Sequence, residues 1–147
     1  MFYIYTEGSI KNIKEVIQFS EQVLDYFFPR GLSRDIDILL AFKKHLDGVS
    51  GLCNGDRDEA CIDIAKGMYD DTGEYLPYDR RHIMHTLAHE LVHAKQYFRG
   101  ELRPNNDGWH GKPVDVSPQS EYANMPWEAQ AYKYETILTE MFYRDSV

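Results

Sequence analysis

Residues 79–100 predict one long helix, and this helix limits the architectures open to the rest of the chain. Asp79 is a suitable N-cap, apolar residues recur at helical spacing as far as Arg99, and Gly100 is a residue that commonly ends helices. Such a helix must bury its apolar face against other elements. The remaining segments are therefore expected to supply strands or helices that pack on it.

Four short segments before this helix predict strands: residues 1–6, 35–42, 48–53 and 60–65. A further helix is predicted from Ser9, as its N-cap, to Phe27, and residues 29–31 would end it. Residues 54–59 predict a turn between the last two strands, and residues 70–78 predict a loop.

The chain after the long helix predicts an irregular connection and a last helix. Residues 101–126 contain four prolines and two glycines, as a long functional loop often does. Pro126 then opens the helix, because proline is favoured in the first helical turn. With 147 residues, 43% of them hydrophobic, the chain can form one core. The sequence thus predicts a single α+β domain over residues 1–147.

The charge and the apolar pattern argue against two kinds of partner. The formal net charge is −8, and an acidic chain repels a phosphate backbone, so nucleic-acid binding is not expected. No run of roughly 18 apolar residues occurs, and no basic segment followed by an apolar one opens the chain. We therefore expect a cytoplasmic monomer with neither a membrane nor a nucleic-acid partner.

Cys53 and Cys61 are the only cysteines, which is too few for a disulfide scaffold. They flank the predicted turn, and a hairpin centred near Arg57 would place them opposite each other. A cross-strand disulfide is one interpretation, and two reduced core thiols, as usual in a cytosolic protein, are the other. They lack the C-x-x-C spacing of a zinc knuckle.

The long helix carries the string His89-Glu90-Leu91-Val92-His93. Residues four apart lie on one helix face with Cβ atoms about 5–6 Å apart. Two imidazole nitrogens there can each reach one Zn²⁺ at about 2.0–2.1 Å. Glu90 lies beside the first ligand, where it can take a proton from a metal-bound water and pass it to a leaving amine. The alternative is a solvated helix that carries two histidines by chance.

The same helix face continues through His85 and His82 at spacings of three and four residues. Histidines in such positions either add ligands or, as is more common, act as polar fillers and support the ligands from behind.

In this string the chain resembles the zincin metallopeptidases, whose active-site helix carries HExxH. The metzincin extension is absent, because Gln96 and Arg99 stand where glycine and histidine would be. The stretches HELVHAKQYFRGEL, WHGK and PWEAQAYKYE are similar to small, mostly uncharacterised bacteriophage and bacterial metallopeptidases. The resemblance covers the last third of the chain or a little more. It implies a minimal zincin-like domain, with a three- or four-stranded sheet on the active-site helix and a C-terminal helix that completes the site, acting in the host cytoplasm if a phage encodes it.

The resemblance also implies a third metal ligand downstream, for which two residues compete. Glu128 corresponds to the glutamate that gluzincins supply from a downstream helix, although Gln130 replaces the second acid of the related PWExEA pattern. His110 lies in an -HG- context similar to that of SprT-like proteases. Glu128 is the preferred ligand, although an acid in a first helical turn can also merely favour the helix dipole. Glu121 and Glu135 are weaker alternatives.

Together these residues predict a zinc metalloendopeptidase that acts on a protein or peptide substrate. His89, His93 and Glu128 would hold Zn²⁺, and Glu90 would be the general base. In the zincin layout the substrate binds as an extra strand at a sheet edge, for which the strands around Cys53 and Cys61 are candidates. An oxyanion donor is also required, and the candidates are Tyr122, Tyr132, Tyr134 and His110.

Two other interpretations fit parts of the same sequence. In a non-catalytic zinc domain the metal would only stabilise the fold, through four protein ligands and without need of Glu90. In an interaction module the chain would keep the helix and lose turnover. Recruitment to DNA, as in SprT-like proteases, would need a basic surface, and the net charge argues against it.

Overall fold

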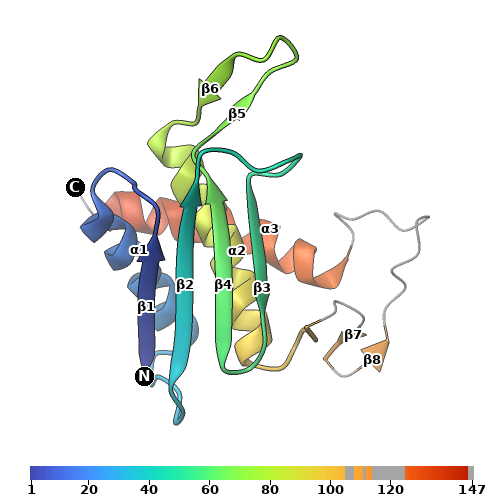
Figure 1. The fold of residues 1–147 in the computed structure, drawn as a ribbon. Coiled ribbons are helices and arrows are strands. Elements are labelled where there is room, and N and C mark those ends of the chain that lie inside the picture. The colour runs from blue at the N-terminus through green and yellow to red at the C-terminus, as the bar shows by residue number, and fades with distance from the viewer. Residues whose placement is uncertain (105–107, 111, 114–124, 146–147) are drawn as a thin grey trace.

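Three helices cover one face of a four-stranded mixed sheet in the computed structural model, which describes residues 1–104, 108–110, 112–113 and 125–145 (Figure 1). The strands of the sheet are β1 (Phe2–Glu7), β2 (Ile36–Lys43), β3 (Gly51–Gly55) and β4 (Glu59–Ala65). The helices are α1 (Ile13–Phe27), α2 (Arg80–Phe98) and α3 (Pro126–Asp145). The described residues also form two two-stranded ribbons, β5 (Gly67–Tyr69) with β6 (Tyr75–Pro77) and β7 (Gly108–Trp109) with β8 (Lys112–Pro113). The predicted α+β class is confirmed.

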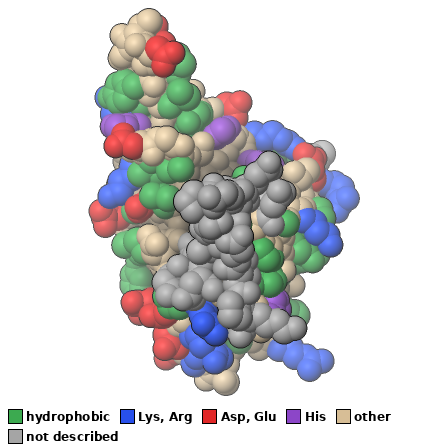
Figure 2. Space-filling model, turned by 90° about the vertical axis from the view of Figure 1, so that its right-hand side faces the viewer, with side chains coloured by type: hydrophobic (Ala, Val, Ile, Leu, Met, Phe, Trp, Pro, Cys, Tyr) green, Lys and Arg blue, Asp and Glu red, His purple; other side chains and the backbone are tan. Residues whose placement is uncertain are grey.

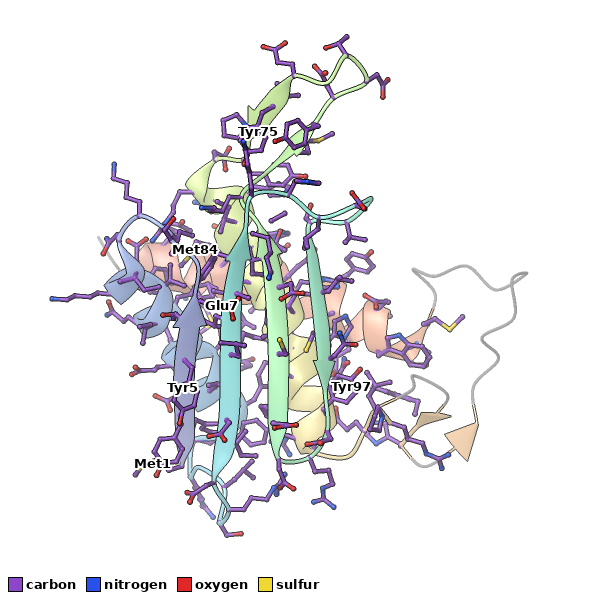
Figure 3. The ribbon with its side chains drawn as sticks, in the orientation of Figure 1. Met1, Tyr5, Glu7, Tyr75, Met84 and Tyr97 are labelled. Carbon is purple, nitrogen blue, oxygen red and sulfur yellow. The ribbon has the colours of Figure 1, made fainter. Side chains whose placement is uncertain are left out.

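The strand order across the sheet is β1-β2-β4-β3. β2 is parallel to both of its neighbours, whereas β3 pairs antiparallel with β4 and forms the far edge. Alternate residues of β2, Ile36, Ile38 and Leu40, are fully buried beneath the helices. The opposite face of the sheet carries exposed side chains such as Tyr5 and Glu7 of β1 (Figure 3).

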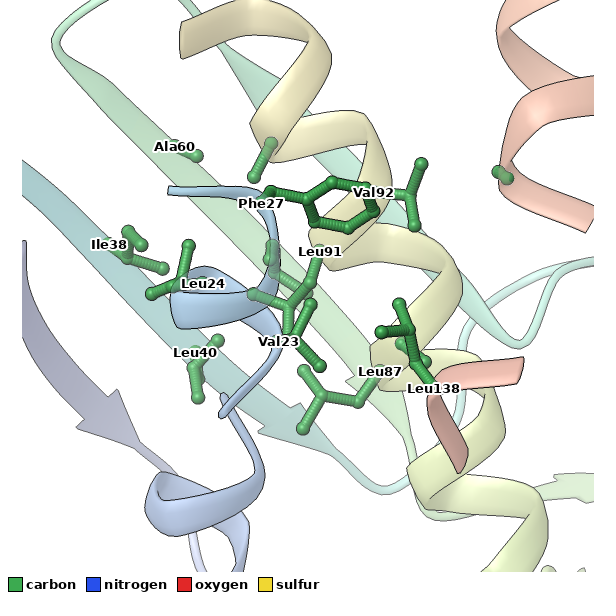
Figure 4. Close-up of a cluster of buried hydrophobic side chains, with 14 of the residues drawn as sticks. Val23, Leu24, Phe27, Ile38, Leu40, Ala60, Leu87, Leu91, Val92 and Leu138 are labelled. Carbon is green, nitrogen blue, oxygen red and sulfur yellow. The ribbon is translucent and has the colours of Figure 1, made fainter. Parts of the chain in front are cut away.

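The hydrophobic core lies between the sheet and the helices, with α2 at its centre. Leu87 and Leu91 of α2 meet Leu24 and Phe27 of α1, and Leu138 of α3 closes the cluster (Figure 4). The HExxH helix is therefore held by the sheet on one side and by both other helices, as the pattern of its apolar residues requires. No helix in the described part of the chain combines the length and hydrophobicity needed to cross a bilayer.

Both predicted ends of α2 are confirmed. The Asp79 side chain accepts a hydrogen bond from the backbone N–H of His82 (2.8 Å), which satisfies one of the free donors of the first turn. Gly100 takes φ +70°, and its N–H binds the carbonyl of Tyr97 (2.9 Å). These local signals fix the two ends of the helix, and the packing of its apolar residues on the sheet and the other helices sets the direction in which its histidines face.

The predicted start of α1 at Ser9 is wrong. The helix begins at Ile13, with Asn12 as N-cap at φ +52°. The Ser9 carbonyl instead accepts a hydrogen bond from Nζ of Lys66 (2.8 Å), and Arg80 Nη2 donates to the Asn12 carbonyl (3.0 Å). Contacts with residues distant in sequence thus hold this segment outside the helix.

The predicted loop at residues 70–78 is also wrong in part, because Tyr75–Pro77 forms β6 in a projecting hairpin with β5. The Asp70 carboxylate accepts hydrogen bonds from the backbone N–H groups of Thr72 and Glu74 (2.9 Å each) and closes the turn. The Tyr75 hydroxyl donates to the Lys44 carbonyl (2.8 Å), which attaches the hairpin to the end of β2 (Figure 3).

The two cysteines are free thiols, so the disulfide interpretation is wrong. In the β3–β4 pair Cys53 lies opposite Ile62, and Cys61 lies opposite Asn54. This one-residue offset puts the two thiols on opposite faces of the sheet. Cys53 packs against the core as expected, but Cys61 is exposed.

Candidate metal centre

α2 and α3 bring two imidazoles and two carboxylates together beside β3. On α2, His89, Glu90 and His93 each offer one ligand atom, and these atoms lie within 4.8 Å of one another. In the first turn of α3, Glu128 places Oε1 2.9 Å from Nε2 of His89 and 3.1 Å from Nε2 of His93. The side chains of Glu128, His93 and His89 are only 2%, 8% and 13% exposed. The three residues predicted as ligands therefore face one shielded point.

The start of α3 fixes the position of Glu128. Pro126 occupies the first turn, and the backbone N–H groups of Glu128 and Ala129 bind the Met125 carbonyl (3.0 and 2.9 Å). The neighbouring Trp127 side chain is 3% exposed and packs in the core. A buried tryptophan thus anchors the turn that carries the carboxylate.

The second nitrogen of His89 is held by a carboxylate. Its Nδ1 lies 2.7 Å from Oε2 of Glu135, which is two helical turns beyond Glu128 on α3. A carboxylate behind a metal-binding histidine orients the ring and makes its other nitrogen a better ligand. The structure places Glu135, weighed from the sequence as a ligand, in this supporting position.

The second nitrogen of His93 is held by an amide whose orientation the neighbouring groups determine. Lys95 Nζ can only donate, so Oε1 of Gln130 accepts from it (3.0 Å). Nε2 of Gln96 donates to that same oxygen (3.1 Å) and to the Trp127 carbonyl (2.9 Å). Oε1 of Gln96 must therefore accept from Nδ1 of His93 (2.8 Å). When the His93 ring carries its one proton on Nδ1, the lone pair of Nε2 points toward Glu128.

Two lone pairs that face one carboxylate oxygen require a positive charge between them. When Nδ1 of His89 donates to Glu135 and Nδ1 of His93 donates to Gln96, both Nε2 atoms of the neutral rings are acceptors, as is Oε1 of Glu128. Ligand atoms around a tetrahedral Zn²⁺ with bonds of about 2.0–2.1 Å lie about 3.3–3.4 Å apart, a few tenths more than the separations here. The donor set therefore fits a divalent cation.

The electrostatics of the cluster favour the same conclusion. Burial alone would lower the pKa of His89, but hydrogen bonds to Glu128 and Glu135 and the charge of Glu90 outweigh it and raise the pKa to about 10. Without a metal ion, the positive charge between these groups is therefore a proton on Nε2 of His89, which donates to Oε1 of Glu128, and a divalent cation would take its place. Burial also raises the pKa of Glu90, against the attraction of the two histidines. A raised pKa suits a carboxylate that must exchange protons near neutral pH.

A cleft of about 120 Å³ separates these groups from the edge of the sheet. Its walls are Gly51–Asn54 of β3 on one side and Glu90, His93, Tyr97, Leu102, Trp127 and Glu128 on the other. A Cβ atom on Gly51 would lie 2.7 Å from Cγ2 of Thr86 and 3.0 Å from Cγ of Glu90. Glycine therefore lets β3 approach the helix at the point where Glu90 lies.

The structure places the other proposed ligands away from this point or does not describe them. His110 is exposed, adopts φ +51°, and its ring contacts Trp109, with ring centroids 4.7 Å apart. It is not among the described residues that line the cleft or form the ligand cluster. Glu121 and Tyr122 lie outside the described residues.

Of the described tyrosines predicted as oxyanion donors, one lies at the centre. The ring of Tyr132 is 5.0 Å from that of His89, and its side chain is half-exposed. Burial first, and then the charges of Glu128 and Glu135, raise the pKa of its hydroxyl, which keeps the proton available for donation. Tyr134 instead packs on Phe27 (5.2 Å).

The two remaining histidines of the stripe have other partners. His82 stacks on Tyr78 at 4.0 Å between ring centroids, and its Nε2 lies 3.3 Å from the Ser50 hydroxyl. Nε2 of His85 lies 3.2 Å from the Thr136 hydroxyl. Neither belongs to the described ligand cluster, as the commoner interpretation of such histidines predicts.

Three supporting residues were not recognised from the sequence. Gln96 lies three residues after His93, a helical spacing that could have indicated the contact. Gln130 and Gly51 carried no usable signal, because their roles depend on how α3 and β3 pack against α2.

Comparison with known proteins adds no assignment to this geometry. No family model matches the chain, and no curated protein is significantly similar to it. The function must therefore be argued from the centre itself.

Proposed function

We propose that the chain is a zinc-dependent metallopeptidase of the gluzincin type. His89, His93 and Glu128 would hold the ion, and Glu90 would act as general base. The observation that carries this proposal is the convergence of both Nε2 atoms on Oε1 of Glu128, beside a buried glutamate. When bound, Zn²⁺ supplies a Lewis acid that polarises a carbonyl and lowers the pKa of water at the site.

Glu90 supplies the proton transfers. Its side chain borders the cleft, so its carboxylate can accept a proton from the attacking water and later donate it to the leaving amine. The raised pKa brings its two protonation states closer in free energy, and both are needed in one turnover. Glu128 and Glu135, by contrast, face the two histidines: Oε1 of Glu128 lies within 3.1 Å of both Nε2 atoms, and Oε2 of Glu135 lies 2.7 Å from Nδ1 of His89.

β3 supplies the binding surface for an extended peptide. It is the edge of the sheet, and among the described residues no strand pairs with its outer side. An added strand would find free backbone N–H and C=O groups there, within the cleft that Glu90 borders. β4, the other strand weighed for this role, lies between β2 and β3 and has no free edge.

Tyr132 is the favoured donor to the developing oxyanion. Its half-exposed ring lies against the ring of His89, on the solvent side of the centre. A neutral hydroxyl placed there donates to negative charge that develops on the substrate carbonyl.

Zinc content of the purified chain tests the ligand assignment. We expect about one zinc per chain by elemental analysis in the wild type and in His110→Ala, and loss of most of it in Glu128→Ala. Full zinc occupancy in Glu128→Ala, or loss in His110→Ala alone, would show that the third ligand is wrong.

Hydrolysis of a fluorogenic casein tests the catalytic assignment. Glu90→Gln should keep zinc and melting temperature while cleavage falls to background, because the amide cannot accept the proton of water. A zinc-loaded wild type that cleaves neither casein nor a peptide library would instead be a non-catalytic zinc domain.

A further inference from the structure

A second cavity lies next to the centre and is not used by the proposed chemistry. It has a volume of about 500 Å³ and lies between residues 45–50, which follow β2, and the β5–β6 hairpin. Val49, Met68 and Tyr69 line it and are 41–42% exposed, and Tyr78 lines it as well. Hydrophobic side chains gather on this projecting hairpin at the top of Figure 2. We call this cavity the hairpin pocket.

The hairpin pocket continues the cleft along the same strand edge. Ser50 lines the pocket, and the next residue, Gly51, lines the cleft beside Glu90. Successive residues of a strand advance by about 3.3 Å, so a peptide paired with β3 would reach the pocket within two or three residues of the reacting bond. The two cavities therefore border consecutive residues at the start of β3, and an extended peptide on this edge would pass from one to the other.

The walls of the hairpin pocket are held before any ligand binds. The Tyr75 hydroxyl binds the Lys44 carbonyl (2.8 Å), and the Lys66 N–H binds the Lys43 carbonyl (2.8 Å). The Tyr69 ring packs edge-on against His45, with centroids 4.9 Å apart. Exposed apolar side chains on an anchored wall offer binding energy with little loss of conformational entropy.

We propose that the hairpin pocket binds a side chain of the substrate on the C-terminal side of the cleaved bond, and that this side chain is apolar and preferably aromatic. This inference rests on the proposed function. The preference for aromatic groups follows from Met68, Tyr69 and Tyr78, whose thioether and rings favour contact with another ring. The side follows from strand direction. β3 runs from the pocket past Glu90, and a peptide in the more stable antiparallel pairing runs the opposite way, so its C-terminal part enters the pocket.

Peptide hydroxamates test this inference on the zinc-loaded full chain. One series carries the chelating hydroxamate at its N-terminal end, followed by three glycines, or by two glycines and one Phe at each position in turn. A reversed series carries the hydroxamate at the C-terminal end. Burial of one Phe ring should give about 10- to 100-fold tighter binding at one position of the first series only. Dissociation constants are measured by calorimetry.

Two variants of one hairpin provide the matched control. Met68 and Leu76 lie opposite each other in the ribbon and are 41% and 43% exposed, but only Met68 lines the pocket. Met68→Asp should abolish the preference for Phe while the all-glycine hydroxamate binds as before, and Leu76→Asp should keep the preference. Melting temperatures show whether both variants are folded.

Each outcome supports or overturns a separate claim. Equal affinity of the Phe and glycine probes overturns the pocket assignment but leaves the metal centre intact. A preference confined to the reversed series overturns the assigned side. Failure of every hydroxamate to bind overturns the proposed function, and the inference with it.

Discussion

The two imidazoles of the candidate centre lie on one helix face but are supported by different chemistry. On the rim side, Nδ1 of His89 binds the carboxylate of Glu135, which is 15% exposed. On the buried side, Nδ1 of His93 binds the amide of Gln96, which is fully buried and bonded in turn to Gln130. A carboxylate keeps part of its hydration at the rim, whereas in the interior a neutral amide avoids the cost of desolvating another charge. The depth of each histidine thus explains the type of its partner.

The largest expected effect is on the buried side, in Lys95→Met. Lys95 is 7% exposed, and its Nζ lies 2.7 Å from Oε1 of Glu101 and 3.0 Å from Oε1 of Gln130. Removing the ammonium group leaves a largely buried carboxylate without this partner, so the free energy of unfolding should fall by about 2–4 kcal/mol. Urea unfolding measures the change. The control Lys133→Met, at an exposed position of α3, should change it by less than about 0.5 kcal/mol.

Next in size is the effect of Gln96→Leu on zinc affinity. Leucine cannot accept a hydrogen bond from the Nδ1–H group, so the His93 proton can move to Nε2, which then has no lone pair for the metal. Affinity should fall about 10- to 100-fold, measured by competition with a chromophoric chelator. Long-range nitrogen–proton NMR on the metal-free chain should show the Nδ1–H tautomer of His93 in the wild type and a mixture in the variant. An unchanged tautomer would contradict the argument that Gln96 sets it.

A smaller loss is expected on the rim side, in Glu135→Gln. The amide oxygen of the variant can still accept from Nδ1 of His89, so the ring keeps its orientation and loses only the negative charge behind it. We expect zinc affinity to fall about 10-fold, the lower end of the range for such partners. A loss of zinc affinity equal to that in Gln96→Leu would contradict this argument. It would mean that the charge of Glu135 matters as much as the hydrogen bond that orients a histidine ring.

The difference between local and distant contacts explains which features could be predicted from the sequence. The α2 caps at Asp79 and Gly100 and the opening of α3 at Pro126 are local signals, and they were predicted correctly. The false N-cap at Ser9 failed because Lys66, far along the chain, binds its carbonyl. The β5–β6 hairpin was missed because three-residue strands carry too little periodicity to recognise.

The candidate centre shows the same limit. The spacing of His89 and His93 predicts two nitrogens on one helix face, and the structure places both beside the same oxygen. The choice between Glu128 and His110 could not be derived from spacing, because it depends on where the Trp127 turn docks. Packing of that turn against α2 places Oε1 of Glu128 beside both histidines, whereas the ring of His110 contacts Trp109.

The smallest expected effect, in Gln130→Glu, tests how far the buried side tolerates charge. A carboxylate at this position would still accept from Lys95 and from Gln96, so the orientation of the Gln96 amide and the tautomer of His93 should persist. The new charge would share the Lys95 ammonium with Glu101, and stronger hydrogen bonds would offset the cost of burying it. Zinc affinity should therefore change less than about three-fold, and the free energy of unfolding by less than about 1 kcal/mol. A loss of zinc affinity as large as that in Gln96→Leu would mean that the neutrality of residue 130, and not only its acceptor oxygen, holds His93 in place.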